Sequence, residues 1–226
     1  MTRQEPAPDR PATPLSQTGR VSARWARVGL PSSATLVEAD DPRLALSDDL
    51  SLARQIIDEI DSDDPEVGAY RQRILAFVDS NPDSLHRSCV SGHLTGSALV
   101  VEEGTGRILM MFHRKLQRWL QPGGHADGDA NLAAVALREA PEETGVEGLR
   151  VDPVPVDLDI HRVEPPGEPA HDHLDVRYLV VAPAGAMPAG NHESEALRWV
   201  TIDELPELGV DPGTLRLARA ALTRLG

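Results

Sequence analysis

The chain has 226 residues, 40% of them apolar, which is enough for a single large domain with a hydrophobic core. Its 36 acidic and 22 basic residues give a formal net charge of −14, which argues against a nucleic-acid polymer or a membrane as partner, because both need a positive protein surface. One cysteine, Cys89, cannot form an internal disulfide, and no apolar run approaches the ~18 residues of a membrane span. We therefore expect a cytoplasmic protein without a signal peptide.

The N-terminal third divides into a tail and two helices. Residues 1–42 contain six prolines and little apolar periodicity, so we expect a disordered or loosely packed tail. The stretch 47–60, SDDLSLARQIIDEI, repeats apolar residues at helical spacing behind Ser and Asp capping residues. The stretch 64–80 begins with Asp64 before Pro65, a favourable helix start. Residues 43–84 are therefore predicted to form a helical hairpin.

The remaining residues, 85–226, are predicted to form one domain. Residues 93–112 contain two apolar runs around a Gly-Thr-Gly turn, which is typical of a β-hairpin. The alanine- and leucine-rich segment 130–140 favours a helix, strands are expected near 149–162, 174–182 and 197–201, and a last helix is expected over 212–225. Because the elements do not alternate regularly as strand and helix, we expect an α+β or mixed α/β fold with a mixed sheet between helices.

The acidic sequence REAPEETG at 138–145 indicates a metal site. On a helix, Glu139, Glu142 and Glu143 fall at i, i+3 and i+4, so their carboxylates share one side. Negative charge near a helix C-terminus opposes the helix dipole unless cations bind there. Divalent cations such as Mg²⁺ prefer oxygen ligands, whereas the alternative is a solvated acidic face.

Residues 124–146, GHADGDANLAAVALREAPEETGV, resemble the Nudix box, whose pattern is G, five residues, E, seven residues, then R-E-U-x-E-E-x-G-U, with U apolar. The residues that match are Gly124, Arg138, Glu139, Ala140, Glu142, Glu143, Gly145 and Val146. The resemblance implies an α/β/α sandwich and hydrolysis of a nucleoside diphosphate linked to another moiety, in the class of ADP-ribose, nucleotide sugars or nucleoside triphosphates.

The same resemblance implies roles for individual residues. Glu142 and Glu143 would bind Mg²⁺ or Mn²⁺, and Glu139 would be a further ligand or the general base for water. Arg138 would orient the carboxylates, and the backbone carbonyl of Gly124 would join the metal ligands. Glu193 is a further candidate acid.

Two positions depart from the Nudix pattern. Ala130 stands where the pattern has its first glutamate, and the neighbouring Asp129 is a candidate substitute. Pro141 removes a helical hydrogen bond and is expected to kink or loosen the last turn. Two alternatives follow: a catalytically impaired Nudix-like module for ligand binding or regulation, and a hydrolase of a non-nucleotide diphosphate such as a prenyl or inositol compound.

A basic cluster precedes the box. Arg114, Lys115 and Arg118 are candidates for phosphate contact on a small phosphorylated substrate, or they form a solvated surface. Trp119 stacks on a base or fills the core, and the core is the favoured interpretation. The helical hairpin caps the substrate pocket or mediates a homodimer.

Five histidines form a second candidate site. The residues concerned are His86, His93, His125, His171 and His173. His171 and His173 would point to one face of a strand, as ligands of a second, transition-metal ion. The set resembles the metal site of isopentenyl-diphosphate isomerases, but Gly123 replaces their catalytic cysteine, which argues against isomerase activity. The alternative is that these histidines bond loop carbonyls or line the substrate pocket.

Overall fold

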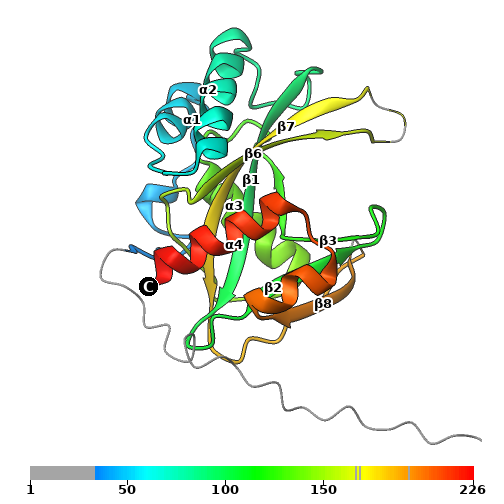
Figure 1. Cartoon of the computed structure of the whole chain (residues 1–226). Coiled ribbons are helices and arrows are strands. Elements are labelled where there is room, and N and C mark those ends of the chain that lie inside the picture. Colours follow the sequence, from blue (N-terminus) through cyan, green and yellow to red (C-terminus); the bar gives the residue numbers. More distant parts are fainter. Residues whose placement is uncertain (1–33, 166, 168, 193) are drawn as a thin grey trace, which may run out of the picture.

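One mixed sheet forms the centre of the computed structural model, which describes residues 34–165, 167, 169–192 and 194–226 (Figure 1). Eight strands in this part of the chain make up the sheet. They are β1 (Gly92–Glu102), β2 (Ile108–His113), β3 (Arg118–Leu120), β4 (Gly123–His125), β5 (Arg150–Val151), β6 (Asp157–Val163), β7 (His171–Ala182) and β8 (Ser194–Val200). β1 pairs in parallel with β7 along its whole length, and it pairs antiparallel with β2 and β4. The predicted mixed sheet is confirmed.

Helices cover both faces of this sheet. They are α1 (Leu50–Asp58), α2 (Pro65–Ser80), α3 (Leu132–Thr144) and α4 (Pro212–Leu225), with short 3-10 helices η1 (Pro42–Leu44) and η2 (Ile202–Leu208). α4 lies in front of the sheet and α3 behind it in the view of Figure 1. Side chains of a strand alternate between faces, so Val100 of β1 packs in the core cluster of α3, whereas Leu99 packs in that of α4. The predicted α/β/α sandwich is confirmed.

Local sequence signals account for the helix starts. Asp49 caps α1 by accepting a hydrogen bond from the backbone of Ser51, and Asp64 caps α2 ahead of Pro65 in the same way. The predicted helices at the N-terminus are confirmed, and α1 and α2 contact each other. Their buried side chains, such as Ile57 and Ile74, share one core cluster with α3 and the sheet.

Part of the segment predicted as a tail is bound to the sheet. Val37 is buried, and its backbone exchanges two hydrogen bonds with Val151 at N···O distances of 2.9 and 3.0 Å. Residues 1–33 lie outside the described residues. The division of the chain into units 43–84 and 85–226 stays a prediction.

The strand expected near 149–162 is two strands. β5 ends at Val151 and β6 begins at Asp157, and the residues between them include Pro153 and Pro155. Because proline has no backbone N–H to donate to a neighbouring strand, this segment leaves the sheet. None of the helices in the described ranges is long and apolar enough to cross a membrane.

Candidate active site

α3 carries the acidic residues of the site, and it is placed on the sheet by a glycine. Gly96 of β1 faces the start of this helix, where a Cβ atom would lie 2.5 Å from the carbonyl oxygen of Leu132. Only glycine allows the helix to approach the strand this closely. Asn131 caps the helix, and Gly145 ends it in the left-handed conformation at φ 65°.

Pro141 does not end the helix, because external donors support the last turn. α3 continues through Pro141 to Thr144. The Asn191 side chain donates a hydrogen bond to the carbonyl of Glu142 at 2.9 Å, and the Ala189 backbone donates one to the carbonyl of Thr144 at 2.7 Å. The helix thus continues past the proline, and the segment before β8 bonds the carbonyls of its last turn. The predicted kink or loosening of this turn stays a prediction.

The carboxylates of Glu139 and Glu143 lie against the two glycines of β4. Glu143 is 9% exposed, and its Oε2 accepts a hydrogen bond from the backbone N–H of Gly123 at 3.1 Å. The Glu139 carboxylate occupies the space beside Gly124, where a Cβ atom would lie 2.6 Å from Oε2 and 2.7 Å from Oε1. Glu142 is exposed in the same turn of the helix.

The charge around Glu139 is unbalanced toward the negative. Burial raises the pKa of Glu139, the Arg138 guanidinium lowers it, and the carboxylates of Glu142 and Asp127 raise it further. Nη2 of Arg138 lies 3.2 Å from Oε1 of Glu139, which matches the orienting contact expected of this arginine. Asp127 is paired with Arg87 at 2.7 Å, so Arg138 is the guanidinium beside Glu139 and the exposed Glu142. A divalent cation would stabilise this arrangement.

The position of the first acid of the pattern is apolar and buried. Ala130 is fully buried in the core. Oδ1 of Asp129 accepts hydrogen bonds from the backbone N–H groups of Asn131 at 2.9 Å and Ser47 at 3.2 Å. Asp129 therefore holds the segment before α1 against the start of α3, and the expectation that it replaces the missing glutamate is not supported. Glu193 lies outside the described residues.

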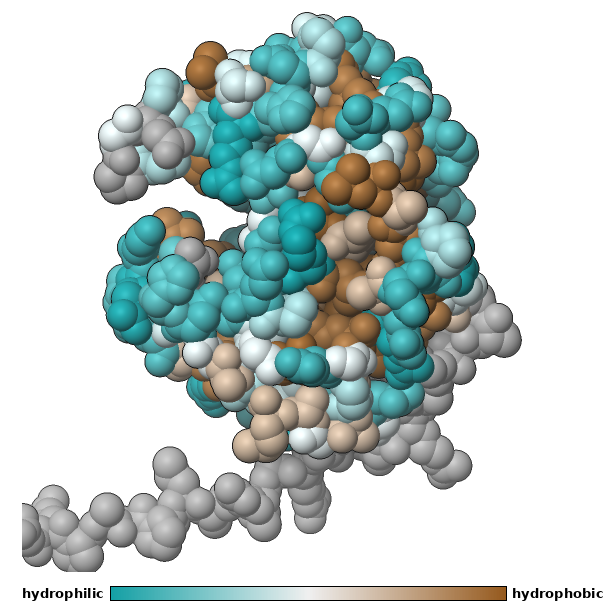
Figure 2. Space-filling model, turned by 180° about the vertical axis from the view of Figure 1, so that it is seen from behind, coloured by the Kyte–Doolittle hydropathy of each residue, from teal (hydrophilic) through white to brown (hydrophobic). Residues whose placement is uncertain are grey.

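The basic cluster lies at the tip of the β2–β3 connection. Arg114, Lys115 and Arg118 are exposed, and their side chains have no hydrogen-bond or ion-pair partner among the described residues. The β2–β3 connection and the β6–β7 hairpin project to the right in Figure 1. In Figure 2, which shows the molecule from behind, the same side is at the left, and the surface is hollowed there. Trp119 is half-buried, and its ring lies 5.3 Å from that of Phe112, as expected for a core residue.

Four of the five predicted histidines lie together. The ring centre of His93 lies 4.8 Å from those of His125 and His171 and 5.1 Å from that of His173. These residues belong to β1, β4 and β7, and the pairing of His93 with His173 places them side by side. His86 is not part of this group: it is exposed, and its ring lies over Gly128, whose φ is +94°.

A family model, the NUDIX domain, matches residues 92–221, which is more than half of the chain. The chain belongs to the Nudix hydrolase family. The match begins at β1 and ends within α4, so it includes the sheet, α3 and the candidate site. No match was found among curated proteins.

Three solved structures are similar to part of this chain. A C. elegans Ap4A hydrolase binary complex is 17% identical, with a TM-score of 0.47, over 56% of this chain and 93% of that one. The M. smegmatis Nudix hydrolase RenU is 23% identical, with a TM-score of 0.42, over 59% and 84%. The NUDIX domain of Shewanella oneidensis NrtR, complexed with ADP ribose, is 18% identical, with a TM-score of 0.47, over 67% and 98%.

This Nudix protein also contains a buried ionic network that the sequence reasoning missed. Arg177 of β7 contacts Asp175 at 2.8 Å, Asp159 at 2.8 Å and Asp157 at 3.3 Å. Thr95 donates to Asp175 from β1, also at 2.8 Å. The sequence pattern that could have revealed this network is His-x-His-x-Asp-x-Arg over 171–177. It places four polar side chains on one face of a strand.

Proposed function

We propose that this Nudix protein is a pyrophosphohydrolase that depends on Mg²⁺ or Mn²⁺ and cleaves a nucleoside diphosphate linked to another moiety. The observation that carries the proposal is the convergence of the Glu139 and Glu143 carboxylates on the backbone of Gly123 and Gly124. The substrate class is that of ADP-ribose, nucleotide sugars or nucleoside triphosphates.

The donor set fits a hard divalent ion. Glu139, Glu142 and Glu143 supply carboxylate oxygens, and the carbonyl of Gly124 supplies a neutral one, which are the ligands that Mg²⁺ and Mn²⁺ prefer. The lack of a side chain at Gly124 leaves room for the Glu139 carboxylate. When bound, the ions would neutralise phosphate charge and lower the pKa of bound water.

The residues around the ions have distinct tasks. Glu139 is either a further metal ligand or the base that accepts a proton from the attacking water, and burial, which raises its pKa, suits the second role. Arg138 holds Oε1 of Glu139 at 3.2 Å and leaves Oε2 for that proton. The hydrogen bond from Gly123 fixes Oε2 of Glu143 and so holds the last turn of α3 in place against β4.

Substrate phosphate requires positive charge beside the site. Arg114 and Lys115 present exposed cationic groups on the β2–β3 connection, and Arg118 presents one at the start of β3. Guanidinium groups bind phosphate oxygens in pairs, whereas the lysine ammonium acts as a point charge. We assign these three residues to phosphate contact.

One observation favours a second candidate function. Ala130 is fully buried, so its place in the pattern offers no carboxylate to a metal ion. A protein that lacks that ligand and still binds its nucleotide without turnover would be a ligand-binding or regulatory module. A third class of ligand consists of non-nucleotide diphosphates.

A substrate panel tests the proposal. Release of phosphate or nucleotide would be measured with Mg²⁺, with Mn²⁺ and with EDTA. The panel contains ADP-ribose, nucleoside triphosphates, dinucleoside polyphosphates, nucleotide sugars, and prenyl and inositol diphosphates. We expect metal-dependent turnover of at least one nucleotide, abolished by EDTA and by Glu143→Gln. Tight binding of a nucleotide without turnover would instead support the regulatory module, and turnover of a prenyl or inositol compound alone would support the third class.

A further inference from the structure

The four histidines of the cluster come from β1, β4 and β7, and His125 points to the face of β4 opposite to that on which the Glu139 carboxylate lies beside Gly124. We propose that His93, His171 and His173 bind a divalent transition-metal ion of the Zn²⁺ class, with His125 as the fourth ligand. The ligand nitrogens of the first three residues lie within 4.8 Å of one another. The inference does not rest on the proposed hydrolase activity.

His93 is the clearest indication of a missing ligand. Its side chain is 3% exposed, and neither ring nitrogen has a hydrogen-bond partner in the described part of the chain. A buried polar atom without a partner is destabilising, so such groups in native proteins are usually bonded. A metal ion among His93, His171 and His173 would satisfy one of these nitrogens.

The spacing of the rings suits a tetrahedral ion. With metal–nitrogen bonds of about 2.0–2.1 Å, two tetrahedral ligand atoms lie about 3.4 Å apart. Nε2 of His125 lies 3.2 Å from Nε2 of His173, close to this separation. The ligand atoms of His93 and His171 lie within 4.8 Å of each other and of that of His173, so the rings must draw closer together when an ion binds.

One ligand is already oriented by its neighbour. Nδ1 of His171 lies 2.9 Å from the carbonyl oxygen of Pro169, so Nδ1 carries the proton and donates it to that carbonyl. The lone pair of His171 is then on Nε2, which is the atom left for a metal. A hydrogen bond from the second ring nitrogen to a carbonyl is the usual way in which proteins orient a metal-binding histidine.

The chemistry of the donors separates this site from the first. Imidazole nitrogens prefer Zn²⁺, Co²⁺, Ni²⁺, Cu²⁺ or Fe²⁺, whereas Mg²⁺ prefers oxygen. In the pairing of β1 with β4, His125 lies beside Thr95, and Gly124 lies beside Gly96. Because successive residues of a strand face opposite sides, the first pair is on one face of the sheet and the second pair is on the other.

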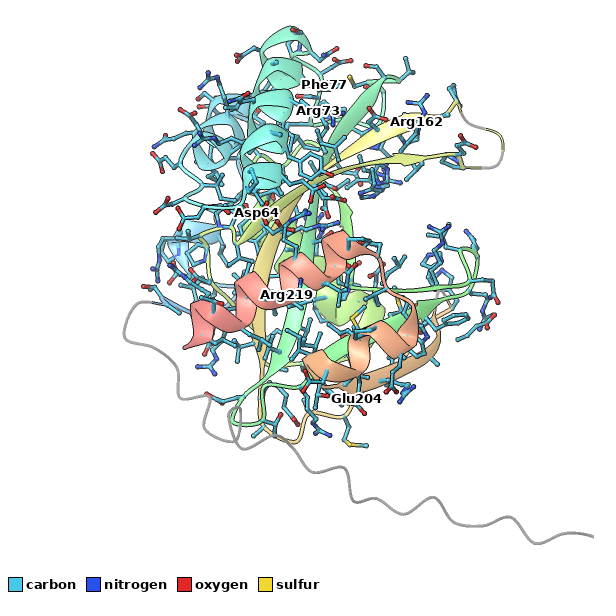
Figure 3. The ribbon with its side chains drawn as sticks, viewed as in Figure 1. Asp64, Arg73, Phe77, Arg162, Glu204 and Arg219 are labelled. Atoms are coloured by element: carbon cyan, nitrogen blue, oxygen red, sulfur yellow. The ribbon has the colours of Figure 1, made fainter. Side chains whose placement is uncertain are left out.

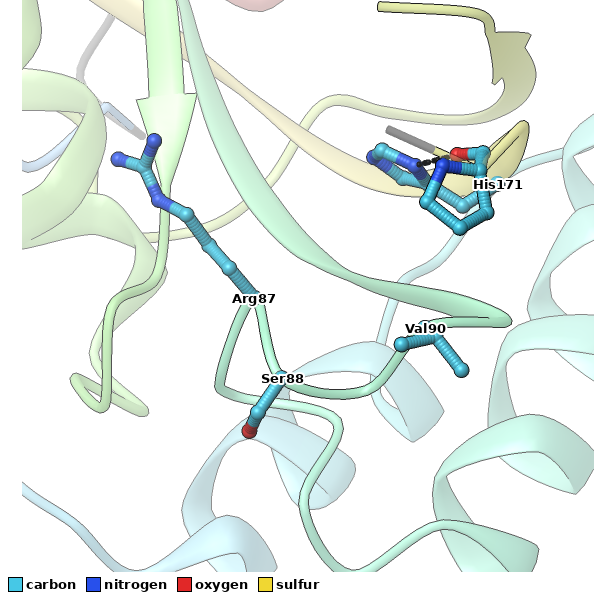
Figure 4. A pocket seen from close by; sticks show the side chains of 5 residues that line it. Arg87, Ser88, Val90 and His171 are labelled. Carbon is cyan, nitrogen blue, oxygen red and sulfur yellow. Dashed lines mark hydrogen bonds between the residues drawn. The ribbon is translucent and has the colours of Figure 1, made fainter. Parts of the chain in front are cut away.

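A pocket of about 430 Å³ lies beside His171, at the edge of the cluster (Figure 4). It is lined by Arg87, Ser88, Val90, Pro169 and His171. Arg87 and His171 lie on two sides of this pocket in Figure 4, and the dashed line there marks the bond from His171 to Pro169. His171 is thus the residue of the cluster that lines this pocket.

Metal binding by untagged, full-length protein tests the proposal. The protein would be stripped of metal, dialysed, and titrated with Co²⁺ while the visible absorption of the Co²⁺ ion is recorded, and Zn²⁺ would then be added in competition. We expect one equivalent of Co²⁺ with the spectrum of a four-coordinate site, displaced by Zn²⁺ and not by Mg²⁺. A wild-type protein that binds no Co²⁺, or that releases it to Mg²⁺, would overturn the proposal.

Matched variants locate the ion. His171→Gln and His173→Gln should weaken Co²⁺ binding at least tenfold, whereas His86→Gln, which removes an exposed histidine outside the cluster, should leave it unchanged. Glu143→Gln should also bind Co²⁺ normally, so loss of hydrolysis and loss of this site are distinguishable. Unchanged Co²⁺ binding in both cluster variants would overturn the assignment, and the wild-type spectrum tests it even where a variant fails to fold.

Discussion

The backbone N–H of Gly123 donates a hydrogen bond to Oε2 of Glu143, with 3.1 Å between the two atoms. This contact joins β4 to the last turn of α3. It fixes the strand that carries Gly124 relative to the helix that carries the glutamates. A glutamine at position 143 keeps an oxygen that accepts this bond and loses only the negative charge. The residue is therefore suited to test charge without disturbing the fold.

Mn²⁺ binding should depend on that charge. The Mn²⁺ concerned is that displaced when Mg²⁺ is added. We expect Glu143→Gln to weaken the binding of this Mn²⁺ at least tenfold, because one carboxylate ligand becomes neutral. The measurement is electron paramagnetic resonance of free Mn²⁺ at increasing Mg²⁺, which excludes ions held by imidazoles. Glu147→Gln, an exposed glutamate just beyond the helix, is the matched control. Equal binding by the two variants would contradict this role of Glu143.

A methyl group at Gly124 should displace Glu139. The Cβ atom of Gly124→Ala would lie 2.6 Å from Oε2 of Glu139, and the carboxylate, being the flexible end of a side chain, is the group that moves. A displacement of about 1 Å costs about 10² in rate, so we expect that loss of turnover with little change in unfolding free energy. Gly68→Ala in α2, which has open space at its Cβ position, should retain activity. Full activity of Gly124→Ala would show that Glu139 has no need of this space.

Removing Arg177 should be strongly destabilising. Its side chain is 4% exposed and bonded to three aspartates. Arg177→Met leaves the buried Asp175 carboxylate without its ion-pair partner, whereas Arg216 still contacts the other two carboxylates. We expect a loss of about 3–5 kcal/mol in the free energy of unfolding, measured with denaturant. Arg162→Met on β6, labelled in Figure 3, removes an arginine whose side chain is 57% exposed, and it should cost less than about 1 kcal/mol. Similar losses for the two variants would argue against a buried network.

Stability in acid should depend on Glu102. Burial raises its pKa, but hydrogen bonds from Thr105, Arg107 and the backbone of Gly185 outweigh burial and lower the pKa overall. The folded state then binds fewer protons than the unfolded state, so the stabilisation is present above the ordinary carboxyl pKa and is lost as pH falls through the lowered value. We expect Glu102→Gln to be destabilised at pH 7 and to approach the wild type at low pH in urea unfolding curves.

The adjacent residue provides the control for that pH dependence. Glu103 is half-exposed and forms an ion pair with Arg150 at 3.0 Å. Glu103→Gln should therefore change the acid limb of the stability curve less than Glu102→Gln does. A wild-type curve that runs parallel to that of Glu102→Gln from pH 7 to pH 3 would show that Glu102 contributes nothing by its charge.

Features set by neighbouring residues could be predicted from the sequence. The cap Asp64 with Pro65 acts within one helical turn, and the glutamates of α3 follow one another on a single helix, so no distant contact is needed to place them on one side. The effect of Pro141 was not predictable in the same way. Asn191 and Ala189, which bond the last turn, come from a segment almost fifty residues away in the sequence.

Features set by strand pairing were harder to predict. β3 and β4 have three residues each and no periodicity of their own, and they exist because β2 and β1 supply the hydrogen-bond partners. The histidine set depends on the register of three strands: pairing of His93 with His173 brings these two together, whereas His86 precedes β1 and is not placed by that register. Spacing along the chain alone cannot make this distinction.

Turnover of a nucleotide diphosphate by Glu143→Gln, compared with Glu147→Gln, tests the central claim most directly. Initial rates would be measured in Mg²⁺ on the best substrate of the panel, with circular dichroism to verify that both variants are folded. If the glutamates of α3 bind the metal ions, the rate of Glu143→Gln should fall at least about 100-fold, whereas Glu147→Gln should keep the wild-type rate. Wild-type turnover by folded Glu143→Gln would contradict the account.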